Sequence, residues 1–134
     1  MSPRTESQWE KIRSKSREKI LNAATELFAE NGFNATSISD IAKKAGISKG
    51  LVYNYFKSKE ELLDDIVFSA FNEFDDFFET LSKNQNDPLE SLYRVLEVTF
   101  KSLKEKPQFW KLITGLSFKQ NIRERYAKQI AHRK

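Results

Sequence analysis

The fold is decided by residues 36–62, which read TSISDIAKKAGISKGLVYNYFKSKEEL. Ser37 and Asp40 have the spacing of a capping box, so the stretch predicts a helix that begins at residue 38. Gly46 can adopt the positive φ that closes a helix, so this first helix should end at residue 44 or 45. The stretch therefore opens with a short, capped helix.

A second short helix is predicted over residues 49–56, with Ser48 as its N-cap. Only residues 46–48 connect the two helices, and a short connection that contains glycine is typical of a helix-turn-helix. Apolar side chains recur at helical spacing in both segments, so we expect one face of each to be buried. These side chains are Ile38, Ile41, Ala42, Ala45, Val52, Tyr55 and Phe56.

A further capping box, Ser58 with Glu61, predicts a long helix that starts at Lys59. The backbone N–H groups at the start of that helix and the surrounding lysines favour a bound phosphate. Residues 36–59 contain one acid, Asp40, against five lysines, which are Lys43, Lys44, Lys49, Lys57 and Lys59. Geometry and charge together indicate DNA binding.

The motifs of this stretch resemble those of the DNA-binding domain of TetR-family transcriptional repressors. They are Thr36, DIA at residues 40–42, AGISKG at 45–50, YNYF at 53–56 and SKEEL at 58–62. The resemblance extends over residues 14–65. Leu51 stands where a threonine is frequent in the family and Asn54 where a histidine is frequent, which leaves the fold intact and leaves the target sequence open.

The resemblance implies an all-α fold with two domains. A helix-turn-helix domain is expected over residues 1–57, with its recognition helix at 49–56. A partial helical domain for effector binding and dimerisation is expected over residues 58–134. The family architecture also implies a homodimer on an inverted-repeat operator.

The recognition helix is expected in the major groove, where Lys49 can reach guanine and Leu51 a thymine methyl. The resemblance implies phosphate contacts for Thr36, Tyr53 and Lys59, although Tyr53 could instead pack in the core. The full set of expected DNA contacts is Thr36, Ser37, Ser39, Lys43, Ser48, Lys49, Gly50, Leu51, Tyr53, Asn54 and Lys59.

The rest of the chain also predicts helices. The first begins as early as Ser7, where Ser7 and Glu10 form a capping box, and ends near residue 30. Beyond the long helix from Lys59, an Asp87-Pro88 start predicts another that stops before residue 107. A short helix at 108–116 and a last one from about 117–120 follow. The apolar pattern of the last helix continues to the end of the sequence without a cap, so we expect the helical domain to be incomplete.

Six aromatic side chains in the second half could wall a pocket for a small apolar ligand. They are Phe71, Phe74, Phe78, Tyr93, Phe100 and Trp110. The alternative is an ordinary core, which aromatic residues at helical spacing form more often. The resemblance implies that such a ligand releases the protein from DNA.

Composition argues against other classes of protein. The 23 basic and 19 acidic residues give a net charge of +4, and the only histidine is His132. Without cysteine or paired metal ligands, we expect no enzyme activity, no cofactor and no metal site. No secretory segment or apolar run of membrane-spanning length is present, so we expect a bacterial cytoplasmic protein. The alternatives are a weakly specific architectural DNA-binding protein, a helical interaction module, and an activator in place of a repressor.

Overall fold

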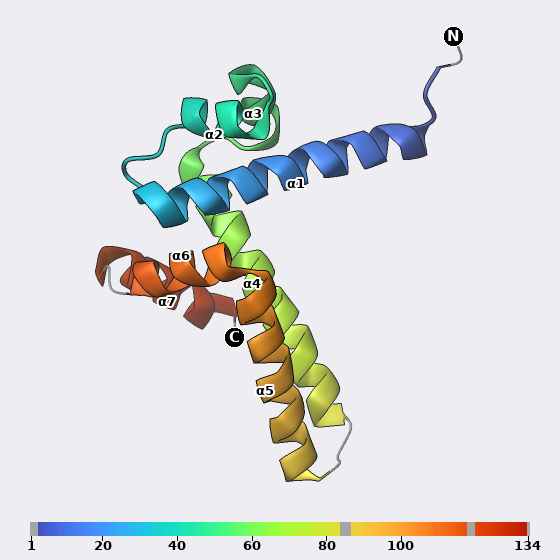
Figure 1. Cartoon of the computed structure of the whole chain (residues 1–134), viewed down its shortest axis with the longest axis vertical. Coiled ribbons are helices and arrows are strands. Elements are labelled where there is room, and N and C mark those ends of the chain that lie inside the picture. Colours follow the sequence, from blue (N-terminus) through green and yellow to red (C-terminus); the bar gives the residue numbers. More distant parts are fainter. Residues whose placement is uncertain (1–2, 84–86, 118–119, 134) are drawn as a thin grey trace. The chain divides into compact units, whose positions relative to one another are not determined.

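The computed structural model describes residues 3–83, 87–117 and 120–133, and all regular structure within them is helical (Figure 1). The helices are α1 (Glu6–Asn31), α2 (Ile38–Ala45), α3 (Lys49–Tyr55), α4 (Lys59–Lys83), α5 (Pro88–Glu105), α6 (Pro107–Ser117) and α7 (Gln120–Arg133). The prediction of an all-α fold is confirmed.

The chain divides into two compact units, Met1–Ile66 and Val67–Lys134. The first unit contains α1, α2, α3 and the first residues of α4, and the second contains the remainder. A domain boundary at residues 57 and 58, as expected from the sequence, stays a prediction.

The start of α1 differs from the prediction. Its N-cap is Thr5, whose hydroxyl accepts from the N–H of Gln8 while the Gln8 side chain accepts from the N–H of Thr5. The predicted cap at Ser7 is wrong because two pairs with capping-box spacing overlap here, and the earlier one is used. At the other end α1 closes as expected, at Gly32 with φ 87°.

The helix-turn-helix agrees with the prediction. Ser37 and Asp40 form the reciprocal capping box of α2, and Gly46 closes the helix in the left-handed conformation with φ 72°. Ser48 then caps α3 by accepting from the N–H of Leu51 at 3.1 Å. The second helix ends at Tyr55, one residue earlier than expected, and Phe56 is its C-cap.

The core of the first unit combines apolar side chains from all four of its helices. An ion pair between Arg17 and Asp65 links α1 to α4 at its edge, and the Arg17 guanidinium lies 5.4 Å from the centre of the Phe56 ring. The largest fully buried apolar side chains are Ile20, Ile41, Val52, Phe56, Leu62 and Leu63. This core holds α2 and α3 against α1 (Figure 1).

Among the residues whose burial the structure describes, the second unit has fewer buried side chains, which include Leu112, Leu116 and Tyr126. The Tyr126 ring meets Phe68 edge-on, with ring centres 5.7 Å apart. Helix α5 starts at Pro88 as predicted, with Asp87 accepting from the N–H of Leu89, but it contributes no buried residue. In the described residues, no helix combines the length and apolar character needed to cross a bilayer.

Candidate nucleic-acid interface

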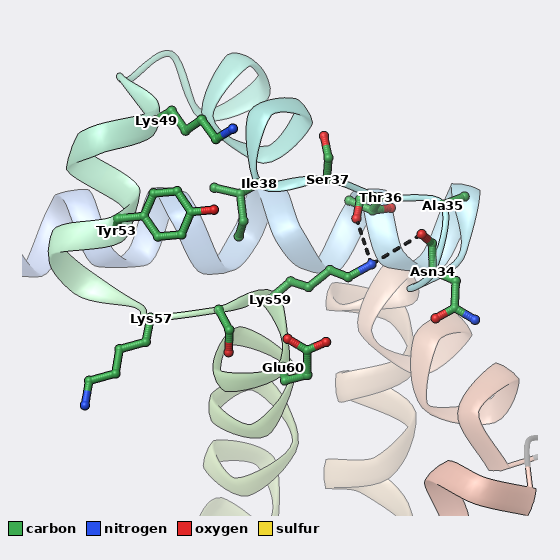
Figure 2. A pocket seen from close by; sticks show the side chains of 11 residues that line it. Asn34, Ala35, Thr36, Ser37, Ile38, Lys49, Tyr53, Lys57, Lys59 and Glu60 are labelled. Atoms are coloured by element: carbon green, nitrogen blue, oxygen red, sulfur yellow. Dashed lines mark hydrogen bonds between the residues drawn. The ribbon is translucent and has the colours of Figure 1, made fainter.

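A hollow of about 440 Å³ lies in the first unit, at the meeting of α2, α3 and the start of α4 (Figure 2). Its wall is built from segments that are distant in sequence. The lining residues are Asn34, Ala35, Thr36, Ser37, Ile38, Lys49, Tyr53, Lys57, Ser58, Lys59 and Glu60. The N-terminus of α2 and the side chains of Lys49 and Tyr53 therefore border one concave surface, the arrangement that suits an anion.

The cap serine of α3 keeps a donor for a bound ligand. The hydroxyl oxygens of Ser37 and Ser48 accept from the N–H groups of Asp40 and Leu51, both at 3.1 Å. A hydroxyl that accepts one hydrogen bond still has its proton to donate. Ser48 can thus cap its helix and donate to a phosphate oxygen at the same time, whereas the Ser37 side chain is also hydrogen-bonded to the Asp40 carboxylate.

Most of the expected DNA-contact residues are exposed. Tyr53 is 48% exposed, so it does not pack in the core, and a side-chain carbon placed on Gly50 would meet no other part of the protein within 4 Å. Leu51 is half-buried. The exposed set is Ser37, Ser39, Lys43, Ser48, Lys49, Gly50, Tyr53 and Asn54. These residues leave one face of α2 and α3 open to a large partner.

The acid of this surface, Asp40, is held in its charged form. Hydrogen bonds from the backbone N–H and the side chain of Ser37 lower the pKa of Asp40 below its ordinary value of 3.8, and the charge of Lys43 adds to this effect. Because its carboxylate accepts a backbone hydrogen bond at the start of α2, Asp40 serves the helix cap.

Two of the expected phosphate ligands use their donors inside the protein. Thr36 is buried, and its hydroxyl donates to the carbonyl oxygens of Gly32 at 2.8 Å and Leu27 at 3.3 Å. The ammonium of Lys59 donates to three backbone carbonyls of the segment between α1 and α2. The phosphate contacts of Thr36 and Lys59 stay predictions.

Lys57 is a residue that the expected set lacks. It is exposed, it lines the same hollow as Lys49 and Tyr53, and its side chain points away from Lys59 (Figure 2). The signal was present in the sequence, where a lysine directly precedes the cap serine of a helix in a basic stretch. The predicted capping box of α4 is present in half: the Ser58 hydroxyl accepts from the N–H of Glu61 at 3.1 Å, whereas the Glu61 carboxylate accepts from the backbone N–H of Lys57 at 2.9 Å and not from that of Ser58.

The aromatic residues expected around a ligand are only partly together. Phe74 and Trp110 meet edge-on with ring centres 6.0 Å apart, and the indole N–H donates to the hydroxyl of Ser102. The other four are exposed, with exposed fractions of 39% for Phe71, 51% for Phe78, and 67% for both Tyr93 and Phe100. The ligand pocket therefore stays a prediction.

Comparison with known proteins gives matches over the same helices. Residues 20–66 match the family of bacterial regulatory proteins described as the TetR family. The fatty acid metabolism regulator protein of Bacillus subtilis is 33% identical over 102 residues, which cover 76% of this chain and 52% of that protein. The HTH-type transcriptional repressor KstR2 of Mycolicibacterium smegmatis is 29% identical over 106 residues, which cover 79% of this chain and 50% of that protein.

A solved structure shares the arrangement of helices. The ketosteroid transcriptional regulator KstR2 of Mycobacterium tuberculosis has a TM-score of 0.68 at 27% identity, over 84% of this chain and 61% of that one. The present chain spans about half the length of the two curated relatives. Since the matched segment holds the capped helix pair and the hollow beside it, the chain belongs to the TetR family of bacterial regulatory proteins.

Proposed function

We propose that this chain is the DNA-reading part of a sequence-specific transcriptional regulator. The observation that carries the proposal is the exposed face of α3, which continues into a hollow formed by the N-terminus of α2 and the lysines around it. Helix α3 enters the major groove, where Lys49, Leu51 and Asn54 address base edges. The lack of a side chain at Gly50 allows the backbone to approach the DNA closely.

The phosphates on either side of the groove bind to donors around the hollow. The hydroxyls of Ser48 and Tyr53 donate to phosphate oxygens, and Lys57 supplies a positive charge beside them. Ser39 and Lys43, exposed on α2, extend this contact along the backbone. Phosphate contacts fix the position of the protein, and base contacts specify the sequence.

The regulator acts as a homodimer on an inverted repeat, with half-sites separated by about 34 Å or a multiple of it. It is a repressor of the bacterial cytoplasm and does not catalyse a reaction. The repressor assignment is supported by the name of the KstR2 relative, which is a transcriptional repressor. Activation would use the same DNA-reading surface and is distinguished by the effect of the protein on transcription.

A small apolar ligand releases the protein from its operator. Support comes from the aromatic side chains of the second unit and from relatives that are named for fatty acid metabolism and for ketosteroids. The release is checked by adding a long-chain fatty acid or a steroid to the bound complex. Lack of both DNA release and a melting shift with either class would argue against an apolar effector.

The test of DNA reading is selection of duplex DNA from a random pool by the purified chain, followed by titration of the selected duplex at two salt concentrations. An enriched inverted repeat would support a dimeric, sequence-specific regulator. Salt-dependent binding without enrichment would support the weakly specific architectural alternative. No binding at either salt concentration would remove the DNA proposal.

A further inference from the structure

The ammonium of Lys59 lies inside the turn between α1 and α2. Its Nζ donates to the carbonyl oxygens of Phe33 at 2.9 Å, Thr36 at 3.2 Å and Asn34 at 3.3 Å. Figure 2 shows the side chain reaching from the start of α4 to the backbone between Asn34 and Thr36. A lysine ammonium has three donors, so these three carbonyls use all of them.

The Phe33 ring holds the same cation from another side. The Lys59 Nζ lies 4.5 Å from the centre of that ring, close enough for a cation–π interaction. The Phe33 ring in turn packs on buried Phe28 of α1, with ring centres 5.2 Å apart. Through this contact, the position of the ammonium is coupled to the core of the first unit.

The end of α1 explains why a cation is favourable in this place. Carbonyl oxygens at a helix C-terminus carry partial negative charge, which a nearby cation stabilises. The last turn of α1 has no basic residue of its own. Lys59, which lies far along the chain at the first position of α4, supplies the missing charge just beyond this end.

The residue that Lys59 holds leads directly into the DNA-reading helices. Thr36 donates its hydroxyl proton to the carbonyl oxygen of Gly32 and offers its own carbonyl to Lys59. Ser37, the N-cap of α2, is the next residue. A shift of this turn would therefore move the start of α2. It would also move α3, because only three residues separate the end of α2 from the start of α3.

We propose that Lys59 is a positioning residue for DNA reading: its ammonium clamps the α1–α2 turn and is not a phosphate ligand. The effect of Lys59 on DNA reading rests on the proposed DNA-binding function, whereas its contacts with the turn are present without DNA. Lys57, two residues earlier and exposed, is the phosphate ligand of the pair. Substitution of Lys59 and substitution of Lys57 should therefore have opposite effects on two measurements, hydrogen exchange in the turn and the salt dependence of DNA binding.

The experiment compares Lys59→Met with Lys57→Met in the full chain. The first measurement is hydrogen exchange without DNA at the N–H of Thr36, which donates to Phe33, and of Asp40, which donates to Ser37. Lys59→Met should speed both exchanges on the order of tenfold, since charge-assisted hydrogen bonds to the turn are lost. Lys57→Met should leave both rates within about twofold, because no turn contact is removed.

The second measurement is the slope of log affinity against log salt concentration for the selected duplex. Lys57→Met should reduce the magnitude of the slope by about 0.9, the value for one phosphate contact. Lys59→Met should weaken binding but retain the slope. Unchanged exchange in Lys59→Met, or a slope reduced by about 0.9, would overturn the clamp.

Two controls keep the result decisive. If far-UV circular dichroism shows that Lys59→Met does not fold, Lys59→Gln replaces it and is read by the same two criteria. If the unchanged chain selects no DNA, the proposed function fails, and the exchange measurement alone then decides whether the clamp exists.

Discussion

At the scale of single residues, Ser37 and Asp40 together stabilise the start of α2. The N–H of Asp40 donates to the hydroxyl oxygen of Ser37, and the N–H and side chain of Ser37 are hydrogen-bonded to the Asp40 carboxylate. The same contacts lower the pKa of Asp40. A carboxyl group whose pKa is lower in the folded state stabilises the fold above its ordinary pKa, and the contribution is lost as the pH falls through the folded value.

Replacement of Asp40 by asparagine is therefore expected to act in a pH-dependent way. Asp40→Asn should lower the free energy of unfolding near pH 6, and the difference from the unchanged chain should shrink as the pH falls below 3.8. Urea unfolding at several pH values measures this difference. Glu10→Gln, which removes another exposed carboxylate, controls for general charge effects. A difference that stays constant through the acid range would contradict the assigned role of the carboxylate.

At the scale of the element, α3 has a buried side and an exposed side in only seven residues. Val52 is fully buried, whereas Tyr53 and Asn54 beside it are exposed. Leu51, between these two faces, is half-buried. An apolar side chain at the edge of a recognition helix is suited to a thymine methyl and contributes to sequence preference without carrying charge.

Leu51→Ala should therefore relax the preference for thymine at one position of each half-site, by about 1 kcal/mol. The salt slope should not change, because no charged contact is lost. Repetition of the DNA selection with the variant, with titration of the duplexes that differ at that position, gives both quantities. Lys57→Met is the complementary control, since it should alter the slope and preserve the preference. An unchanged thymine preference in Leu51→Ala would remove Leu51 from the base-reading set.

Local signals were sufficient to predict α2, the turn and α3, because the caps at Ser37, Gly46 and Ser48 are made by hydrogen bonds between residues three or four positions apart. Where two local signals overlap, as at Thr5 and Ser7, the sequence alone does not choose between them. The contacts of Lys59 could not be predicted at all. Its three carbonyl partners lie 23 to 26 residues away, so only the packed fold brings them together.

At the scale of the whole molecule, the two compact units differ in how they are held together. The first has a core of fully buried aliphatic and aromatic side chains, whereas the described part of the second has fewer buried residues and contains edge-on ring contacts. Each unit contains one of the two tryptophans, Trp9 and Trp110. The stability of each unit can therefore be followed separately.

Ile41→Ala should cost the first unit about 2–5 kcal/mol, since the side chain is fully buried and its removal leaves a cavity. DNA binding should be lost with it. In a Trp9→Phe background, the urea midpoint of Trp110 emission should move little, because the cavity lies in the other unit. Exchange at the N–H of Val52, whose partner is the carbonyl of Ser48, reports the first unit. Equal shifts for both probes would mean that the units unfold as one.

The conformation of Gly46 has a consequence for chirality. With φ 72° and ψ 31°, this residue adopts the mirror image of an ordinary right-handed helical backbone. An L-amino acid is strained in that region by roughly 1–2 kcal/mol, whereas a D-amino acid prefers it. A chain assembled from synthetic peptides could therefore carry D-alanine at this position without backbone strain. In the turn between α2 and the recognition helix, the backbone of Gly46 therefore favours a D-amino acid over an L-amino acid.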